Sequence, residues 1–356
     1  MKEQQNVKRV KFGLFSDLHY QEGHRMVHVS DIEEIMEHSH KSGADFVIQL
    51  GDFSSSWRKS PEAVRAYLEN PFGLPAYGVF GNHDLQSSGN SMETVVPKLN
   101  NREVVWGTTD GKMDAASEIA YYHFDVNGIR IVCLDTNFSY NPENERWEHN
   151  LPNSYALQTG NVKEHSLGDV QIAWLNNVLN DAADNGIRCI VCSHASFSGK
   201  PYAESPSSSE VREIFKQVNE KRKGTVLAAL NGHRHATHAE IIDGIFYLDM
   251  NVTRAGSWSP TKIPHYSDEH TFIMVKYDDD GNETERVQTK LNELGRGNFS
   301  WFFKDPLYTV VSIGTDGKIS VEPRETEWIY GVEPPSRHEG IQTRVVGGEF
   351  DLGLQE

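Results

Sequence analysis

Short apolar runs alternate with amphipathic stretches along the first three-quarters of the chain. Runs such as VKRVKFGLF, ADFVIQL and AYGVF are rich in β-branched and aromatic residues and end abruptly in polar ones, which is typical of buried strands. Between them, apolar side chains recur at helical spacing in 27–42 and 169–183, and 61–68 begins with a proline, which a helix tolerates in its first turn. A fourth helix is predicted from Ser207–Ser209 through Val218. The alternation predicts an α/β protein.

Two pairs of predicted strands are joined by short turn signals. IAYYHFDV and IRIVCLDT flank Asn127-Gly128, and AEIID and IFYLDM flank Gly244, so both pairs predict hairpins. From 137 to 168 the chain is long, polar and irregular in pattern, and loops of that length are usually functional. We expect its aromatic residues Tyr140, Trp147 and Tyr155 to lie at the rim of a binding site.

The pattern changes after about Lys276. A turn at 278–281 precedes the aromatic run FSWFF, and YTVVSI and KISVE predict another hairpin around Asp316-Gly317. The tail from Gly331 is predicted to be irregular chain on the surface. We therefore divide the chain into a main domain, 1–275, and a β-rich extension with an irregular tail, 276–356, packed on the core. The aromatic run 301–303 would anchor the extension or cap a cleft.

Composition narrows the choice of partners and compartment. The 356 residues include 34 Lys and Arg against 51 Asp and Glu, a formal charge of −17, so the average surface repels nucleic acid and anionic membranes. No apolar run is long enough to span a membrane, and the first residues lack the apolar core of a signal peptide. We expect a cytoplasmic protein that binds neither nucleic acid nor membrane.

The three cysteines do not form a disulfide framework by number. Cys189 and Cys192 are spaced C-x-x-C, but they lie within an apolar run that predicts a strand. Residues three apart on a strand point to opposite faces, so a shared metal is disfavoured. We expect Cys133, Cys189 and Cys192 to be buried structural thiols.

Five strand-like runs each end in side chains that can bind a metal. These are Asp17, His19, Asp52, Asn82, His194, His233 and His235. Carboxyl ends of strands in α/β proteins meet at one edge, and seven polar donors gathered there would be costly without cations. Taken singly, each would be a helix cap or a solvated loop residue. The series of five favours one joint site, whose oxygen and imidazole donors suit Mn, Fe, Zn or Ni.

The blocks DLH, GD, GNHD, CSH and GHRH resemble the five-block signature of calcineurin-like metallophosphoesterases. The resemblance covers about Val7 to Met250 and points to the bacterial phosphodiesterase and phosphohydrolase branch. It implies a four-layer αββα sandwich of two mixed β-sheets flanked by helices, with the C-terminal β-rich part as an appendage. It also implies that 1–275 is the catalytic domain.

The resemblance further implies a dinuclear centre with divided roles. Asp17, His19 and His235 would hold one ion, Asn82, His194 and His233 the other, and Asp52 would bridge them with its two oxygens. His83 would be the catalytic histidine, oriented by Asp84. Two such cations (Mn, Fe or Zn, divalent or trivalent) lower the pKa of a shared water, and the resulting hydroxide attacks phosphorus while His83 assists.

Substrate class follows from smaller features. GDFSSS lacks the tyrosine that purple acid phosphatases carry three residues after the aspartate, and GDFSSS and GNHD differ from the GDxVDRG and GNHE blocks of Ser/Thr protein phosphatases. YYHFDVNGIRIVCLDT and LGDVQIAWLNNVL are similar to cyclic-nucleotide phosphodiesterases and ADP-ribose/CDP-alcohol hydrolases. We expect a small phosphodiester or phosphomonoester substrate derived from a nucleotide. The alternatives are a non-catalytic binding scaffold and a phosphoprotein phosphatase.

Three further side chains are candidates for substrate binding. Arg234 would pair with a phosphate, or form an outward salt bridge. Tyr20 and Trp57 follow the first ligand pair and the Asp52 block, where each would stack on a base or pack in the core.

Overall fold

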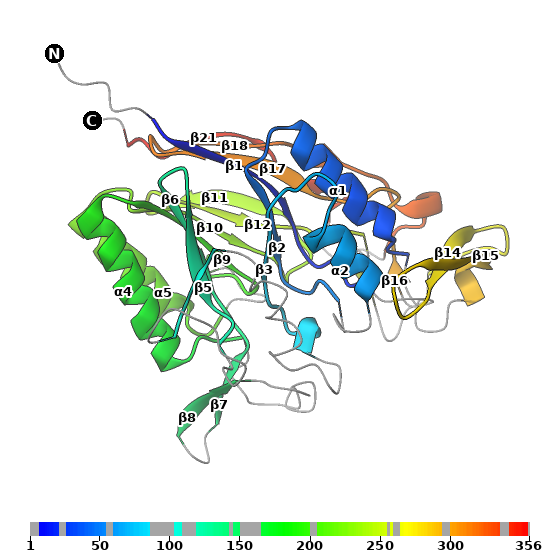
Figure 1. The fold of residues 1–356 in the computed structure, drawn as a ribbon, viewed down its shortest axis with the longest axis horizontal. Coiled ribbons are helices and arrows are strands. Elements are labelled where there is room, and N and C mark those ends of the chain that lie inside the picture. Colours follow the sequence, from blue (N-terminus) through cyan, green and yellow to red (C-terminus); the bar gives the residue numbers. More distant parts are fainter. Residues whose placement is uncertain are drawn as a thin grey trace.

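The computed structural model describes twelve ranges: 7–20, 26–54, 60–85, 103–108, 119–141, 145–149, 165–199, 205–254, 257–258, 264–293, 300–334 and 342–354. Two large sheets form the centre of the molecule, and two pairs of helices lie outside them (Figure 1). Within the described ranges, none of the helices combines the length and apolar character that crossing a bilayer requires.

The first sheet has six strands in the order β21-β18-β17-β1-β2-β3. Its parallel part consists of β1 (Arg9–Phe15), β2 (Phe46–Leu50) and β3 (Ala76–Val79). β17 (Thr309–Gly314) pairs antiparallel with β1, and β18 (Lys318–Val321) and β21 (Gly348–Asp351) continue the sheet. The C-terminal extension thus supplies half of this sheet.

The second sheet has seven strands in the order β11-β12-β10-β9-β6-β5-β4. Its parallel centre consists of β6 (Ile129–Cys133), β9 (Arg188–Ser193), β10 (Val226–Asn231) and β12 (Ile245–Asp249). β5 (Tyr122–Val126), β4 (Val105–Trp106) and β11 (His238–Ile242) pair antiparallel at its edges. The hairpins predicted around Asn127-Gly128 and Gly244 are confirmed, and Asn127, Gly128, Asp243 and Gly244 all have the positive φ that tight hairpins need.

Helices cover the outer face of each sheet, which gives four layers (Figure 1). α1 (Val29–Lys41) and α2 (Pro61–Leu68) lie on the first sheet, and α4 (Asp169–Asn185) and α5 (Ser208–Lys221) lie on the second, so the four predicted helices are confirmed. The larger core joins residues of both sheets with residues of α1 and α2. Between the sheets, the rings of Phe46 and Phe124 meet edge to face at 5.4 Å. A second core joins α4 and α5 to the outer face of the second sheet. The predicted αββα sandwich is confirmed.

The cysteines lie as the strand pattern predicts. Cys133, Cys189 and Cys192 are buried and free of disulfides. Cys192 faces the core between the sheets, whereas Cys189 faces the helical layer. Burial raises the pKa of the Cys133 and Cys189 thiols to about 12. These thiols are therefore packing groups.

Two regions predicted to be irregular contain strands. Within 137–168, β7 (Phe138–Asn141) pairs with β8 (Arg146–His149). In the tail, β20 (Arg344–Val345) pairs with β19 (Arg324–Glu325), and β21 completes the first sheet. The prediction of an irregular tail is wrong there because the exposed edge of β18 supplies hydrogen-bond partners that the tail's own composition does not reveal.

The rest of the C-terminal part forms small two-stranded sheets. β14 (Thr271–Tyr277) pairs with β15 (Glu283–Lys290), and β13 (Ser257–Trp258) pairs with β16 (Ser300–Trp301). Lys276 lies inside β14, and the division of the chain at 275 stays a prediction. Trp301, Phe302 and Phe303 are buried, and Phe303 belongs to the larger core, which matches the anchoring role.

Candidate metal centre

The seven candidate ligands follow the carboxyl ends of five parallel strands. Asp17 and His19 follow β1, Asp52 follows β2, Asn82 follows β3, His194 follows β9, and His233 and His235 follow β10. Backbone hydrogen bonds continue beyond the strand ends. Asp17 N–H donates to Gly51 O at 3.0 Å, and Gly232 N–H donates to His194 O at 3.1 Å. The loops are therefore held next to one another, and six of the seven ligand residues are buried.

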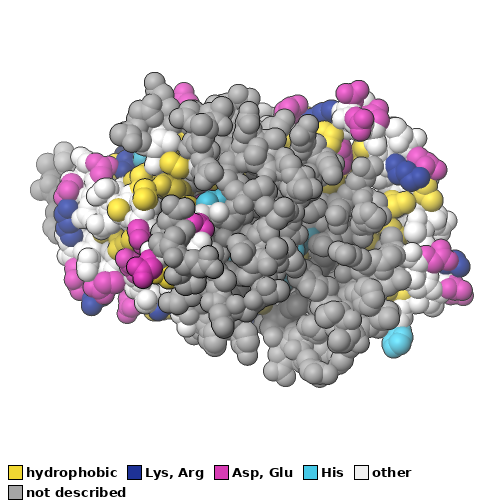
Figure 2. Space-filling view, turned by 90° about the horizontal axis from the view of Figure 1, so that it is seen from below, with side chains coloured by type: hydrophobic (Ala, Val, Ile, Leu, Met, Phe, Trp, Pro, Cys, Tyr) yellow, Lys and Arg dark blue, Asp and Glu magenta, His cyan; other side chains and the backbone are white. Residues whose placement is uncertain are grey.

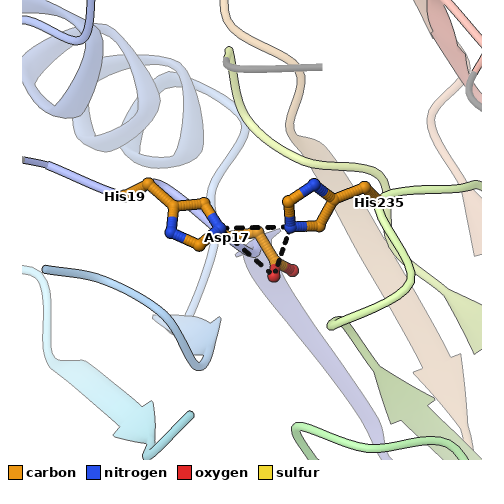
Figure 3. A group of neighbouring side chains, drawn as sticks. All are labelled: Asp17, His19 and His235. Carbon is orange, nitrogen blue, oxygen red and sulfur yellow. Dashed lines mark hydrogen bonds and ion pairs between the residues drawn. The ribbon is translucent and has the colours of Figure 1, made fainter. Parts of the chain in front are cut away.

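The first cluster joins Asp17, His19 and His235 (Figure 3). His19 Nε2 lies 3.1 Å from His235 Nε2, and Asp17 Oδ1 lies 3.1 Å from His235 Nε2 and 3.8 Å from His19 Nε2. Asp17 Oδ2 accepts hydrogen bonds from Ser16 Oγ at 2.5 Å and from the His233 backbone N–H at 2.9 Å. Asp17 Oδ1 is buried and accepts no hydrogen bond from the residues that the structure describes. One oxygen holds the loop, and the other faces the two imidazoles.

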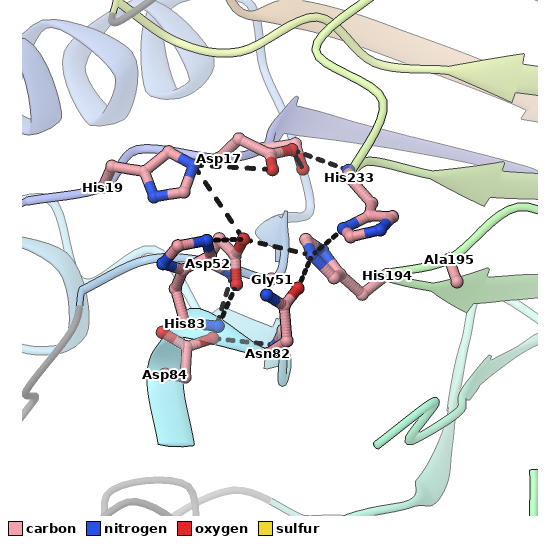
Figure 4. A network of polar contacts seen from close by, with 12 residues as sticks. Asp17, His19, Gly51, Asp52, Asn82, His83, Asp84, His194, Ala195 and His233 are labelled. Atoms are coloured by element: carbon pink, nitrogen blue, oxygen red, sulfur yellow. Dashed lines mark hydrogen bonds and ion pairs between the residues drawn. The ribbon is translucent and has the colours of Figure 1, made fainter. Parts of the chain in front are cut away.

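The second cluster joins Asp52, Asn82, His194 and His233 (Figure 4). His194 Nε2 lies 3.2 Å from Asn82 Oδ1, 3.1 Å from His233 Nδ1 and 3.2 Å from Asp52 Oδ2. His194 Nδ1 lies 2.7 Å from Leu50 O and donates to it, so Nε2 carries the lone pair that faces the cluster.

Asp52 connects the two clusters through a single oxygen. Its Oδ2 lies 3.2 Å from His194 Nε2, 3.9 Å from His19 Nε2 and 3.9 Å from His83 Nε2. Its Oδ1 accepts the backbone N–H of His83 at 2.7 Å. Oδ2 faces both clusters, and Oδ1 fixes the loop that carries His83, while the bridging of two ions by both oxygens stays a prediction.

Charges in the pocket act strongly on one another. Burial would raise the pKa of Asp52, but His194, His83 and His19 outweigh it and hold that pKa well below its usual range. Burial also lowers the pKa of His194, but Asp52 reverses this and raises it to about 10. Burial lowers the pKa of His233 well below its ordinary value. A proton and a cation thus compete for the same nitrogens beside Asp52.

The backbone of the ligand residues is unusual. Five of the seven candidate ligands have φ between +50° and +67°: Asp17, His19, Asp52, His233 and His235. This conformation costs a non-glycine residue about 1–3 kcal/mol and persists only where surrounding structure imposes it. The close approach of the loops also requires glycine, because a Cβ at Gly232 would lie 2.6 Å from Asp17 Oδ2 and one at Gly51 would lie 2.4 Å from His194 Nδ1.

Comparison with known proteins shows which family the chain belongs to. The sequence model of the calcineurin-like phosphoesterases matches residues 10–237, which span all five ligand-bearing loops. The chain belongs to that family. The family implies two divalent metal ions.

This calcineurin-like phosphoesterase is similar in sequence to one curated protein and in fold to one solved structure. It is 24% identical over 219 residues to the manganese-dependent ADP-ribose/CDP-alcohol diphosphatase of Arabidopsis thaliana, an alignment that covers 53% of this chain and 64% of the relative. The chain thus spans less than two thirds of that protein's length. Its fold is similar to the crystal structure of a dimetal phosphatase from Danio rerio, with a TM-score of 0.53, 14% identity, and coverage of 88% of this chain and 95% of that one.

The donor set fits the two cations that the family implies. Two ligand atoms about 2.1 Å from one ion lie roughly 3.0–3.4 Å apart, and the closest nitrogen pairs in both clusters are 3.1 Å apart. The buried Asp17 Oδ1, which has no hydrogen-bond partner within the described ranges, would gain one in such an ion. Carboxylate, amide and imidazole donors without thiolate suit Mn, Fe or Zn.

His83 and Asp84 lie in the short 3-10 helix His83–Leu85, directly after Asn82. The His83 ring meets the His19 ring edge to face, with centroids 4.8 Å apart. His19, Asp52 and His83 also have potential metal-ligand atoms that all lie within 4.8 Å of one another. Asp84 is fully buried and accepts backbone N–H bonds at 2.9 Å from Asp52, 2.9 Å from Gly81 and 3.0 Å from Ser54. Through these bonds Asp84 connects two loops that carry ligands. The sequence predicted only that Asp84 orients His83, and it did not predict this connection.

His165 is a residue of this pocket that sequence reasoning missed. Its ring packs on the His233 ring with centroids 4.3 Å apart. Burial lowers the pKa of His165 to about 4, and the charges of His194, Asp52 and His83 act on it as well. Its position in the polar stretch NVKEHSLGD gives no periodic signal, because the sequence before it has no long apolar run.

The candidate substrate residues are less uniform. Arg234 pairs with Asp249 at 3.1 Å, and Tyr20 is 2% exposed within the main core, which favours the structural alternative for both. Tyr140 lies in β7 opposite Trp147 of β8. Trp57 and Tyr155 lie outside the described residues.

Proposed function

We propose that this phosphoesterase hydrolyses a phosphodiester or phosphoanhydride bond in a small nucleotide-derived substrate and that it uses two manganese ions. Asp17, His19 and His235 would hold one ion, Asn82, His194 and His233 the other, and Asp52 would serve both. The name of the Arabidopsis relative supports the metal and the substrate class.

The observation that carries the proposal is the position of Asp52 Oδ2. This one oxygen lies within 3.9 Å of imidazole nitrogens from both clusters, so the two sets of donors share a centre (Figure 4). When bound, two divalent cations supply Lewis-acid stabilisation of the phosphate and lower the pKa of water. The chain's own groups set where these ions sit: Leu50 O fixes the tautomer of His194, and Ser16 Oγ fixes the carboxylate of Asp17.

His83 supplies the proton chemistry in this proposal. Its Nε2 lies 3.9 Å from Asp52 Oδ2, and its side chain is 13% exposed, so the ring faces the shared centre and still reaches solvent. An imidazolium there donates a proton to the leaving oxygen of the ester, since proton transfer by a positioned histidine lowers the barrier of that step. The hydrogen bond from His83 N–H to Asp52 Oδ1 keeps the ring beside the carboxylate.

The surface is consistent with a small substrate. On the face in Figure 2, Asp and Glu side chains are spread over both ends and are interspersed with Lys and Arg. With a formal charge of −17 for the chain, a long polyanion would meet repulsion, whereas a single phosphate group needs only the local positive charge of the centre.

A substrate screen with controlled metal content tests the proposal. The protein is stripped with EDTA, reloaded with Mn²⁺, Zn²⁺ or Fe²⁺, and assayed on bis-p-nitrophenyl phosphate, p-nitrophenyl phosphate, cyclic nucleotides, sugar phosphates, ADP-ribose and CDP-alcohols. We expect Mn²⁺ to restore turnover, with the nucleoside diphosphate derivatives hydrolysed fastest. Absence of turnover on every substrate by protein that holds two ions would favour a binding scaffold. Preference for the sugar phosphates would overturn the substrate class.

A further inference from the structure

His165 lies beside the second cluster without being part of it. The His233 ring packs against two other imidazoles. Its centroid lies 4.3 Å from that of His165 and 4.8 Å from that of His194. The described residues contain three groups of potential metal donors, and within each group the ligand atoms all lie within 4.8 Å of one another. His165 is in none of these groups, so its ring lies next to the ligands without joining their donor atoms.

The segment that carries His165 is fixed by hydrogen bonds on its C-terminal side. Ser166 exchanges two backbone hydrogen bonds with Phe138 of β7, at 3.3 and 3.1 Å. Ser166 Oγ bonds Ser207 Oγ at 2.5 Å, and Leu167 N–H donates to the same Ser207 oxygen at 3.1 Å. His165 itself has φ +60°, a conformation that costs a non-glycine residue about 1–3 kcal/mol. Packing thus imposes a strained backbone where the histidine stands.

The imidazole has a hydrogen-bonding need that the described part of the chain does not meet. His165 Nδ1 is buried and has no hydrogen-bond partner there. A buried polar group left in this state costs about 1–3 kcal/mol, and strain and unmet hydrogen bonds concentrate at binding sites. A purely structural position would be served better by an apolar side chain of similar size.

We propose that His165 is a substrate-contacting residue of this centre and donates an N–H hydrogen bond to a phosphate oxygen bound beside Asp52, His194 and His233. The inference rests on the proposed function, since it requires that a phosphate bind there. It adds to the two clusters a donor that stabilises the substrate and leaves the ions in place. Phosphate esters have several oxygen acceptors, so a donor one ring away from the ligands complements the oxygens that the ions do not reach.

Three variants test the inference on manganese-loaded protein. His165→Phe keeps a ring against His233 and removes the N–H, His165→Gln keeps an amide donor, and His123→Phe is the matched control. His123 also has a buried Nδ1 that finds no partner in the described part of the chain, but it packs near Trp174 of α4, with centroids 6.2 Å apart. Binding of inorganic phosphate is measured by calorimetry, metal content by mass spectrometry, and KM and kcat on the best substrate.

We expect His165→Phe to weaken phosphate binding and raise KM about tenfold, the loss of one hydrogen bond to a charged group, with two ions retained. His165→Gln is expected to stay within about threefold of the wild type, and His123→Phe to leave phosphate binding unchanged. Unchanged phosphate affinity in His165→Phe would overturn the inference, and so would loss of metal, which would make His165 a support of the ligands. If His165→Phe does not fold, His165→Gln decides the question. Tenfold weaker phosphate binding together with fewer than two bound ions in that variant would overturn the inference. Wild-type protein that binds neither manganese nor phosphate would instead refute the proposed function itself.

Discussion

The carboxylate of Asp84 accepts a hydrogen bond from the backbone N–H of Asp52 at 2.9 Å. The same Asp84 oxygen accepts the N–H of Gly81 at 2.9 Å, and the other oxygen accepts the N–H of Ser54 at 3.0 Å. Three backbone donors from two loops thus meet on one buried side chain. The loop that carries the shared ligand is thereby tied to the loop that carries Asn82 and His83.

Asp84→Asn tests this connection. An amide offers one acceptor oxygen and sets its NH2 group against a backbone N–H, so at least one buried donor loses its partner. We expect a loss of about 2–4 kcal/mol in the free energy of unfolding and weaker metal binding, measured by urea unfolding and metal titration. Asp45→Asn is the control, because Asp45 accepts the Lys11 N–H away from the centre. A variant that kept both stability and metal but lost activity would instead support the orientation of His83 as the main role of Asp84.

His83→Ala separates catalysis from metal binding. We expect kcat to fall about 10²–10⁴-fold, because the general acid is removed, while the protein retains two ions. The measurements are steady-state kinetics and metal content by mass spectrometry. The potential ligand atoms of His83, His19 and Asp52 lie within 4.8 Å of one another, so His83 could itself bind an ion. Loss of an ion in His83→Ala would therefore contradict the assignment. It would make His83 a ligand rather than the acid.

Asp52→Asn examines the shared oxygen. Because Asp52 Oδ2 faces both clusters, we expect both ions to bind at least 100-fold more weakly and to be lost together on dialysis. Asn82→Ala provides the contrast, since Asn82 belongs to the second cluster alone and its removal is expected to weaken one ion. If Asp52→Asn released one ion and kept the other, Asp52 would serve a single site.

Much of the centre could be predicted from sequence because strand ends follow a simple rule. Each ligand stands just after an apolar run, and parallel strands bring such positions to one edge, so seven residues far apart in sequence could be assigned to one place. The four main helices and the two hairpins of the second sheet followed from hydrophobic spacing and turn signals. The sandwich was implied by the resemblance of the ligand blocks to calcineurin-like metallophosphoesterases.

Features set by the detailed path of the loops could not be predicted. The spacing of Asp52 and His83 does not show that one carboxylate oxygen holds the His83 N–H while the other faces both clusters. His165 stands in a polar stretch, and the hydrogen bonds of Ser166 and Leu167 with Phe138 and Ser207 that hold it beside His233 have no signal in the sequence. β21 joins the first sheet through an exposed edge of β18, a partnership that composition does not encode.

His123 gives a pH dependence that is independent of the metals. Burial lowers its pKa to about 4, below the value of 6.5 for a free histidine, with a further contribution from Arg130. The unfolded chain therefore binds the proton first, and the stability associated with neutral His123 is complete above pH 6.5 and is lost as the pH falls toward 4. Because the ring is only partly buried, we expect this to amount to about 1 kcal/mol between pH 7 and pH 5. In urea unfolding with EDTA present, His123→Gln should lose less stability over that range; equal slopes for both proteins would contradict the assignment.

Gly232→Ala tests the close contact between the loops after β1 and β10. A Cβ at this position would lie 1.8 Å from Ser16 Oγ and 2.6 Å from Asp17 Oδ2, so the hydroxyl and the carboxylate that it holds must both move. We expect the first cluster to bind its ion at least tenfold more weakly and the second to lose less affinity, because Asp17 reaches the second cluster only through the backbone N–H of His233. Gly244→Ala is the control, because Gly244 has φ +75° but open space around it, so it is expected to lose about 1 kcal/mol of stability without any change in metal binding. Metal titration of both variants decides the matter. Full affinity at both sites in Gly232→Ala would show that Asp17 can shift without cost, and its carboxylate would then not be a fixed ligand.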